Sequence, residues 1–393
     1  VMPESEPAAF EPMWCAWGYE REATFAEILG TLPKVKELGI KWATVDDGYQ
    51  IAEGDWELDT KRFPGGDRDM VDLVKKMKAY GLKVQLWWAP LAADPGTKVL
   101  KENPDFITLS KQQTPHYITW WDSYYLSPVD SGVVSYSRDL VDRFMKKYDF
   151  DGLKLDGQHL NSVHPDYNWK HHPECPQYSY EQLPGFFKMI YDESRSINPH
   201  AVIQNCPCGC CMSFYNLPYT NQTVASDPTS SWQVRLKGYV YKALVPRTAY
   251  FGDHVELSDN GDDFASSFGI GAVLGTKFTW PKNNPKVKAD YRLTPEKEVI
   301  WKKWFSLYNE KMLSTGEYVN GLYDIGYSRP EAHAFYASSF DGDILVKGLE
   351  EGKKYELYDY FNEVSLGEVE GPEARLHCKF ERALLFQANE VKK

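Results

Sequence analysis

The chain has 393 residues, of which 42% are hydrophobic and 25% are charged, and its formal net charge is −12 at pH 7. This composition is ordinary for a globular protein and excludes collagen, a coiled coil and a wholly disordered chain. The acidic balance argues against nucleic acid or an acidic membrane surface as the main partner. Aromatic residues make up 15% of the chain, which fits either a large core or surfaces that bind sugars.

Apolar runs and helical patterns alternate over about the first three hundred residues. We predict strands at Met13–Trp17, Lys41–Val45, Leu82–Trp87, Gly152–Leu155, Ala201–Gln204, Thr223–Ala225, Thr248–Phe251 and Lys277–Thr279. Predicted helices cover Ala23–Leu38, Met70–Tyr80, Ser131–Tyr148, Tyr180–Ile197, Trp232–Ala243, Asp263–Val273 and Pro295–Leu313. Strands that alternate with helices predict an α/β fold with a parallel sheet, and eight such units predict a (β/α)8 TIM barrel.

The pattern changes after residue 316. Short strands are predicted at Phe335–Ser339, Asp343–Lys347, Lys354–Asp359, Val364–Gly367, Ala374–Phe380 and Ala383–Gln387, with turn residues between them. We therefore expect an N-terminal lead-in at residues 1–11, a catalytic barrel at 12–316 and a small antiparallel β-sandwich domain at 317–393.

The sequence shows no targeting or membrane segment. Its start is acidic and contains proline, without a basic region followed by an apolar one, and no run of about 18 apolar residues occurs. The seven cysteines are odd in number, and four of them crowd into residues 206–211. Free thiols in a reducing compartment fit this pattern best, so we expect a cytoplasmic protein. The abrupt start suggests that an N-terminal part is missing.

Reactive residues of a barrel sit at the carboxyl ends of its strands. Here those ends carry carboxylates, one lysine and several tryptophans: Trp17, Asp46, Asp47, Trp87, Trp88, Lys154, Asp156, Cys206, Asp227, Asp253, His254 and Trp280. A rim of this composition, without a phosphate-binding loop, is most simply a carbohydrate-active site.

Asp156 and Asp227 are the candidate pair for glycoside cleavage, which needs two carboxylates by the common route. Asp156 has Lys154 two residues back on the same face of its strand, and a nearby ammonium favours the ionised carboxylate of a nucleophile. Asp227 lies in another loop, with no neighbour that would lower its pKa, and is the candidate acid/base. The alternative for either residue is a helix cap or an ordinary loop position.

Four motifs occur in the order found in the α-galactosidase, or melibiase, group, family 36 of the glycoside hydrolases: Asp46-Asp47-Gly48-Tyr49-Gln50, Lys154-x-Asp156, Cys206-x-x-Gly209 and Ser226-Asp227. The stretch from Ser226 through Arg235 to His254 also resembles that family. The opening Trp14-Cys15-x-Trp17 is similar to its raffinose-synthase branch. The resemblance covers about residues 12–315, and the C-terminal β domain fits it too.

The resemblance implies a retaining double displacement without a cofactor, most simply on terminal α-linked galactose. Asp156 would be the nucleophile and Asp227 the acid/base. Asp46 and Asp47 would hold the O4 and O6 hydroxyls of the sugar, and Lys154 a hydroxyl near O3 or O4. The rest of the implied site is Cys206, Gly209 and Arg235 around O2, with Trp17, Trp87 and Trp88 as walls.

The sequence departs from the family's pattern in three places. Leu155 stands where the family usually has Trp, and the segment Pro207–Cys211 replaces a glycine-rich stretch beside O2. The large N-terminal β-supersandwich of the family is absent from this chain. Alternatives for the function are an α-N-acetylgalactosaminidase or other α-glycosidase, an α-galactosyl transferase like the raffinose synthases, and a non-catalytic sugar-binding barrel.

Other polar clusters allow further interpretations. Cys206, Cys208, Cys210 and Cys211, with His171, His172 and Cys175, are a weaker candidate for a metal site than for buried thiols, so we expect no metal. His159, His164, His171 and His172 lie in the insertion Gln158–Tyr178, which is either a subsite or lid or a solvated loop. Trp120 and Trp121 either pack or form a subsite for the leaving group, and His254 is more simply satisfied within its loop.

The expected partner is an α-linked oligosaccharide or glycoconjugate, with no nucleic acid and no membrane. Whether the chain forms a homo-oligomer is left open.

Overall fold

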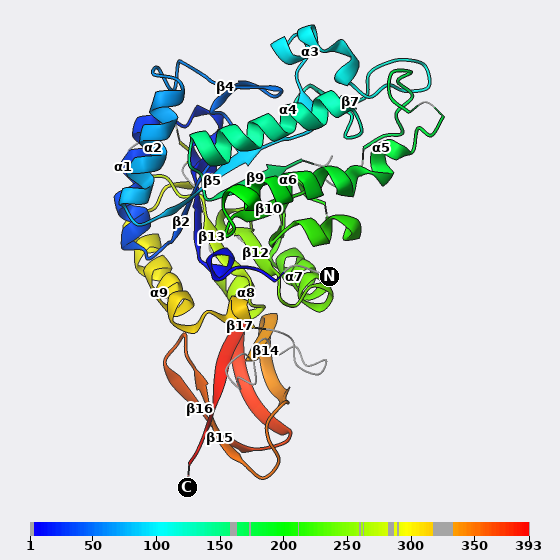
Figure 1. Cartoon of the computed structure of the whole chain (residues 1–393). Coiled ribbons are helices and arrows are strands. Elements are labelled where there is room, and N and C mark those ends of the chain that lie inside the picture. Colours follow the sequence, from blue (N-terminus) through cyan, green and yellow to red (C-terminus); the bar gives the residue numbers. More distant parts are fainter. Residues whose placement is uncertain are drawn as a thin grey trace.

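The computed structural model describes residues 4–157, 163–172, 174–210, 212–258, 261, 263–281, 287–288, 291–316 and 333–392. Among these residues, eight parallel strands close into a barrel in the spatial order β1-β13-β12-β11-β10-β9-β5-β2. The strands are β1 (Met13–Cys15), β2 (Trp42–Val45), β5 (Lys83–Trp88), β9 (Gly152–Asp156), β10 (Val202–Cys206), β11 (Gln222–Val224), β12 (Ala249–His254) and β13 (Val273–Thr276). The predicted (β/α)8 barrel is confirmed, and Figure 1 shows helices around it and a β domain below it.

The long helices begin where capping residues allow. Thr24 caps α1 (Phe25–Glu37) in a capping box with Glu27, and Thr294 caps α9 (Pro295–Lys311), which starts with proline. The other helices of the barrel layer are α2 (Asp67–Ala79), α4 (Ser131–Asp142), α6 (Leu183–Ile197), α7 (Ser231–Leu244) and α8 (Phe264–Gly269), with the short α3 (Lys98–Glu102) and α5 (Tyr178–Glu181) in loops. No helix in the described ranges combines the length and the apolar character needed to cross a bilayer.

Apolar side chains fill the amino-end half of the barrel interior. Trp42, Val202, Ala249 and Val273 start four of the strands and pack together. The short helix Pro7–Phe10 lies against them, and the indole Nε1 of Trp42 donates to the carbonyl oxygen of Ala8 at 2.7 Å. With this end filled, the carboxyl ends of the strands are the side on which a cavity forms.

Two loops at the carboxyl ends carry small sheets of their own. The loop after β2 forms the hairpin of β3 (Gln50–Ala52) and β4 (Asp55–Leu58). The loop after β5 holds a three-stranded sheet of β6 (Ala92–Ala93), β8 (Ser123–Tyr125) and β7 (Tyr117–Ile118). Trp120 and Trp121 lie in the turn between β7 and β8.

The eighth barrel strand lies earlier in the chain than predicted. β13 spans Val273–Thr276 rather than Lys277–Thr279, because α8 already ends at Gly269. The apolar run before Gly275 fits the end of a helix and a buried strand equally well on periodicity alone. Gly275 belongs in the strand, where a Cβ would lie 2.1 Å from the Phe251 ring, so only glycine allows this close approach.

The C-terminal part is the predicted antiparallel β domain. Where we expected a sandwich, the described strands β14 (His333–Val346), β15 (Lys354–Asp359), β16 (Val364–Glu370) and β17 (Ala374–Glu390) form one four-stranded sheet in the order β14-β17-β15-β16. β14 and β17 each join two predicted strands, since their pairing continues through a bulge between Ala337 and Ser339. The domain boundary predicted at residue 316 adjoins residues outside the described part and stays a prediction.

Candidate active site

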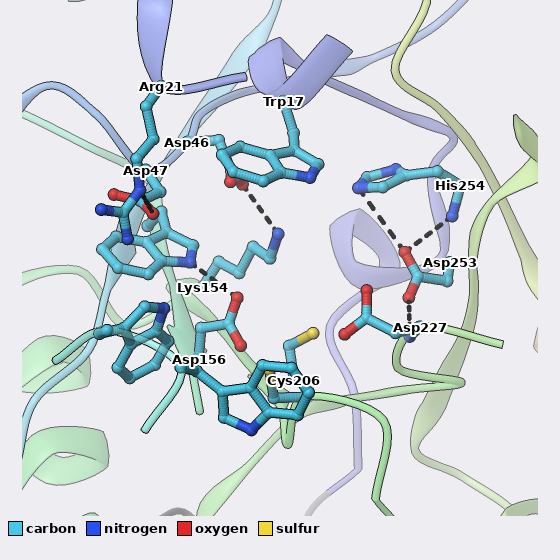
Figure 2. A pocket seen from close by; sticks show the side chains of 14 residues that line it. Trp17, Arg21, Asp46, Asp47, Lys154, Asp156, Cys206, Asp227, Asp253 and His254 are labelled. Carbon is cyan, nitrogen blue, oxygen red and sulfur yellow. Dashed lines mark hydrogen bonds and ion pairs between the residues drawn. The ribbon is translucent and has the colours of Figure 1, made fainter. Parts of the chain in front are cut away.

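A cavity of about 310 Å³ opens at the carboxyl ends of the barrel strands. Figure 2 shows its lining side chains, which come from the ends of β2, β5, β9, β10, β11 and β12, from the segment after β1 and from the turn between β7 and β8. The lining residues are Trp17, Arg21, Asp46, Asp47, Trp87, Trp120, Trp121, Lys154, Asp156, Cys206, Cys208, Asp227, Asp253 and His254. Most of the predicted site residues therefore meet in one cavity.

Lys154 and Asp156 face this cavity together, as expected for residues two apart on a strand. The intervening Leu155 points into the core between barrel and helices. The indole Nε1 of Trp87 donates to Asp156 Oδ2 at 2.7 Å. The other carboxyl oxygen, Oδ1, is buried and has no hydrogen-bond partner among the described residues. Unpaired buried acceptors are rare in folded proteins, and they often mark functional groups.

Asp46 and Asp47 follow β2 and are both held by cations. Asp46 Oδ2 accepts from Lys154 Nζ at 2.8 Å and from the Cys15 thiol at 3.0 Å. Burial acts to raise the pKa of Asp46, but the Lys154 ammonium and the thiol outweigh it, and the pKa is lowered. Asp47 pairs with Arg21 Nε at 2.8 Å, and burial raises its pKa against the pull of that guanidinium.

Asp227 and Asp253 approach each other on the opposite side of the cavity (Figure 2). The backbone N–H of Asp227 donates to Asp253 Oδ2 at 2.7 Å. Ser226, Asp227 and Asp253 all have left-handed backbone, with φ of 54°, 44° and 66°. Non-glycine residues seldom adopt this conformation, and such residues cluster at active sites.

Burial raises the pKa of both candidate catalytic carboxyls, to about 7 for Asp156 and to about 6 for Asp227. The Lys154 ammonium lowers the pKa of Asp156, whereas the next cause after burial for Asp227 is the like charge of Asp253, which raises it. Asp156 is the more deeply buried of the two residues, and Asp227 is exposed. The Lys154 ammonium favours the ionised form of Asp156, and the like charge of Asp253 favours the protonated form of Asp227, which suits a nucleophile and an acid.

Three predicted site residues lie away from the cavity. Trp88 pairs with Leu155 across β5 and β9, whereas Trp87 pairs with Lys154, so Trp88 faces the core and packs on Phe144. The Gly209 N–H donates to Ser226 Oγ at 2.9 Å, and Gly209 lines a separate apolar groove beside α7. Arg235 points from α7 to Ser266 and lies over the Tyr336 ring of the C-terminal domain.

Trp280 is also displaced from the rim. Because β13 ends at Thr276, Trp280 lies well past the strand end, with the Lys34 ammonium 4.6 Å from its ring centroid.

Arg21, Cys208 and Asp253 line the cavity as well, and none of them is among the predicted site residues, although Asp253 stands at a predicted strand end. Arg21 lies in a helical segment after β1, where no motif marks it. His254 lines the cavity; its Nε2 lies 3.6 Å from Oδ1 of the neighbouring Asp253, and its Nδ1 has no partner among the described residues. Burial lowers its pKa well below the ordinary value, so its imidazole is neutral.

The other polar clusters have local partners. Burial raises the pKa of the Cys206 and Cys208 thiols, which are therefore protonated at neutral pH. Cys211 and His159 lie outside the described residues, and within the described part no group of three or more His, Cys, Asp or Glu side chains is placed to hold a metal ion. His171 instead bonds Asp166 at 2.5 Å, and His164 stacks on His116.

A cavity with aromatic walls and paired carboxylates suits a sugar, whose C–H face packs on rings while its hydroxyls donate to charged oxygens. The family model for melibiase matches residues 12–266, which is more than half of the chain. The chain belongs to the melibiase family.

Curated relatives agree with this assignment. The chain is 27% identical, over 98% of its length, to an A type blood α-D-galactosamine galactosaminidase from Flavonifractor plautii, of which it covers 36%. It is 25% identical over 48% of its length to α-galactosidase 1 from Pediococcus pentosaceus, of which it covers 26%. The chain thus spans about a third or less of the length of these relatives.

Solved structures show the same fold. The chain matches a family 36 α-galactosidase, AgaA from Geobacillus stearothermophilus in complex with raffinose, with a TM-score of 0.70 and 16% identity, over 97% of this chain and 55% of that one. The α-galactosidase from Lactobacillus brevis gives a TM-score of 0.71 at 17% identity, over 98% of this chain and 55% of that one.

Proposed function

We propose that the chain is a retaining α-glycoside hydrolase that removes terminal α-linked galactose by double displacement. The observation that carries this proposal is the meeting of Asp156 and Asp227, with raised pKa values, in one cavity of a melibiase-family barrel. Its curated relatives are α-galactosidases and an α-galactosaminidase, which supports the same class of substrate.

In the first step, an oxygen of Asp156 attacks the anomeric carbon while the bond to the leaving oxygen breaks. Attack needs ionised Asp156, and the positive charge that develops at the anomeric carbon favours that form. Asp227 in its protonated form gives its proton to the leaving oxygen. In the second step Asp227 takes a proton from water, the water oxygen bonds to the anomeric carbon, and Asp156 leaves.

The sugar is held from the opposite side of the cavity. Asp46 and Asp47, each paired with a cation, accept from hydroxyls, with Trp17 beside them as an apolar wall (Figure 2). Trp120 is 66% exposed yet lines the cavity, so its ring is available to the leaving group at the mouth. The side chains fill every role of this mechanism without a cofactor. A cytoplasmic location stays a prediction from the free thiols.

A second candidate substrate is a 2-amino-2-deoxy-α-galactoside. Among the described residues that line the cavity, five carboxyl groups (Asp46, Asp47, Asp156, Asp227 and Asp253) face two cations, Arg21 and Lys154, while His254 is neutral. An excess of acid in a buried site favours a cationic ligand such as a protonated amine. The relative that matches along almost the whole chain is named for galactosamine.

The test is a panel of aryl glycosides: α-galactoside, 2-amino-2-deoxy-α-galactoside, α-N-acetylgalactosaminide, α-glucoside and β-galactoside, with proton NMR of the first anomer released. The proposal predicts turnover of α-galactoside with the α-anomer first. Faster turnover of the amino sugar would favour the second candidate and keep the mechanism. Turnover of the β-galactoside alone, or release of the β-anomer first, would contradict the proposal.

A further inference from the structure

Asp253 is a buried carboxylate at the cavity that the proposed mechanism does not use. It lies near the end of β12 and is 5% exposed. One carboxyl oxygen, Oδ2, accepts from the backbone N–H of Asp227 at 2.7 Å, and the other, Oδ1, accepts from the backbone N–H of His254 at 2.8 Å. This side chain therefore ties two neighbouring barrel loops together at the point where the acid/base stands.

The backbone on both sides of this contact is unfavourable without support. Ser226, Asp227 and Asp253 have left-handed φ values although none of them is glycine. Lys237 of α7 supports the same turn, since its Nζ donates to the carbonyl oxygens of Ala225 and Ser226. A hydrogen bond from a backbone N–H to a carboxylate is charge-assisted and stronger than a neutral one. The Asp253 carboxylate thus favours the turn that aims Asp227 into the cavity.

The charges around Asp227 come from several strands. The negative groups are Asp253 on β12, Asp156 on β9 and Asp46 at the end of β2, and the positive groups are Lys154 on β9 and Lys277 beyond β13. The neutral groups are His254 on β12 and the protonated thiols of Cys206 and Cys208 at the end of β10. After burial, Asp253 is the largest cause of the raised pKa of Asp227, ahead of the two lysines, which act in the opposite direction.

We propose that Asp253 is the positioning residue of the acid/base: its carboxylate fixes the left-handed turn that carries Asp227 and places a like charge beside it. The inference rests on the proposed function, because it assigns Asp227 the role of acid. It deepens that function, since a third carboxylate, Asp253, supports the nucleophile and the acid/base of the conventional mechanism. The proposed role of Asp253 is to hold Asp227, and it requires no contact between Asp253 and the substrate.

The test is the isosteric variant Asp253→Asn, with kcat/KM measured against pH on two α-galactosides. A methylumbelliferyl leaving group needs some help from the acid, and a 2,4-dinitrophenyl group needs almost none. Acid catalysis is lost as pH rises through the pKa of Asp227. Removing a like charge lowers that pKa, so the alkaline limb should move to lower pH, by about one unit. At the alkaline side the methylumbelliferyl substrate should then lose about tenfold in rate, and the dinitrophenyl substrate little.

Asp55→Asn is the matched control. Asp55 is also buried and also accepts from two backbone N–H groups, those of Lys98 and Val99, at 2.6 and 3.0 Å, but it does not line the cavity. A purely structural role for Asp253 would make both variants alike: lower thermal stability and an unmoved pH profile. An alkaline limb that stays in place in Asp253→Asn would overturn the proposal.

Two further measurements cover the remaining outcomes. Selective loss of a 2-amino-2-deoxy-α-galactoside in Asp253→Asn, with the pH profile unchanged, would make Asp253 a substrate-binding residue and also overturn the proposal. Carbon-13 NMR titration of the Asp227 carboxyl in the unmodified chain needs neither turnover nor the variant. It should give a pKa of about 6, and a value near 4 would contradict the proposal even if no α-glycoside is cleaved.

Discussion

The two sides of the cavity hold their carboxylates in opposite ways. Beside β2, Asp46 and Asp47 each bond to a cation, Lys154 or Arg21. Beside β11 and β12, Asp227 and Asp253 face each other, and in the part of the chain that the structure describes neither has a lysine or arginine within ion-pair distance. The first side is suited to hold hydroxyls, and on the second side Asp227, whose pKa is raised to about 6, is suited to give and take a proton.

Asp156 lies between the two sides and shares features of both. It is near the Lys154 ammonium and bonded by Trp87, yet its pKa is raised by burial and by Asp227. The nucleophile of a double displacement must be ionised when it attacks, and the Lys154 ammonium and the Trp87 indole favour that form of Asp156. Substitutions on one side of the cavity at a time separate the two arrangements.

The largest effect is expected for Asp156→Ala. Without the carboxylate no glycosyl-enzyme forms, so kcat should fall on the order of 10⁴-fold or more. The thermal unfolding temperature should change little, because burying this carboxyl group costs desolvation free energy that the variant no longer has to meet. The measurement is kcat with circular dichroism melting alongside. Full activity in a folded variant would remove Asp156 as the nucleophile.

Asp227→Ala should lose on the order of 10²- to 10⁴-fold in kcat/KM on a poor leaving group, and far less on a dinitrophenyl glycoside. Azide should accelerate the variant by replacing water in the second step, and the product should be the α-glycosyl azide. Rates by absorbance and NMR of the azide product test this. Equal losses on both leaving groups, without any azide product, would exclude the acid/base role.

Lys154→Met breaks the cation-held side. It leaves the Asp46 carboxylate buried without its ammonium, and losing one partner of a buried pair costs about 3–5 kcal/mol of unfolding free energy. The matched control is Lys76→Met, whose pair with Asp72 is half exposed and should cost about 1 kcal/mol or less. Urea unfolding of both variants measures the difference. Similar losses for the two would mean that the Asp46–Lys154 pair is not desolvated.

The smallest effect is expected for Trp120→Ala at the mouth of the cavity. Stacking on an exposed ring contributes about 0.5–1.5 kcal/mol, so kcat/KM for aryl or oligosaccharide substrates should fall about two- to tenfold. A glycosyl fluoride has no ring in its leaving group and should be unaffected. Trp169→Ala is the control, since Trp169 is equally exposed and does not line the cavity. A loss on the fluoride as well would place Trp120 outside the leaving-group subsite.

The sequence predicted the barrel and the Lys154-x-Asp156 pairing because both follow from local periodicity. Strand alternation separates Trp87 from Trp88, but only the register with β9 tells which of them faces inward, and register is a long-range property. The prediction that Arg235 lies at the sugar site was wrong for the same reason, since the direction of its side chain is set by a long-range contact with Tyr336 of the C-terminal domain.

Nothing in the sequence marks Arg21 as a site residue, because a basic residue in a helical segment is usually solvated. Asp253 stood at a predicted strand end, but its contact with Asp227 joins two loops and no motif records it.

The most direct test of Asp156 as the nucleophile is to trap the covalent intermediate. Incubation with a 5-fluoro-α-galactosyl fluoride should slow hydrolysis of the intermediate and leave one sugar on each chain, and peptide mass spectrometry should then locate it. We expect a single modified residue, Asp156, with labelling abolished in Asp156→Ala and retained in Asp253→Asn. Labelling of Asp227 or of another residue, or turnover of an α-galactoside with inversion and no label, would contradict it.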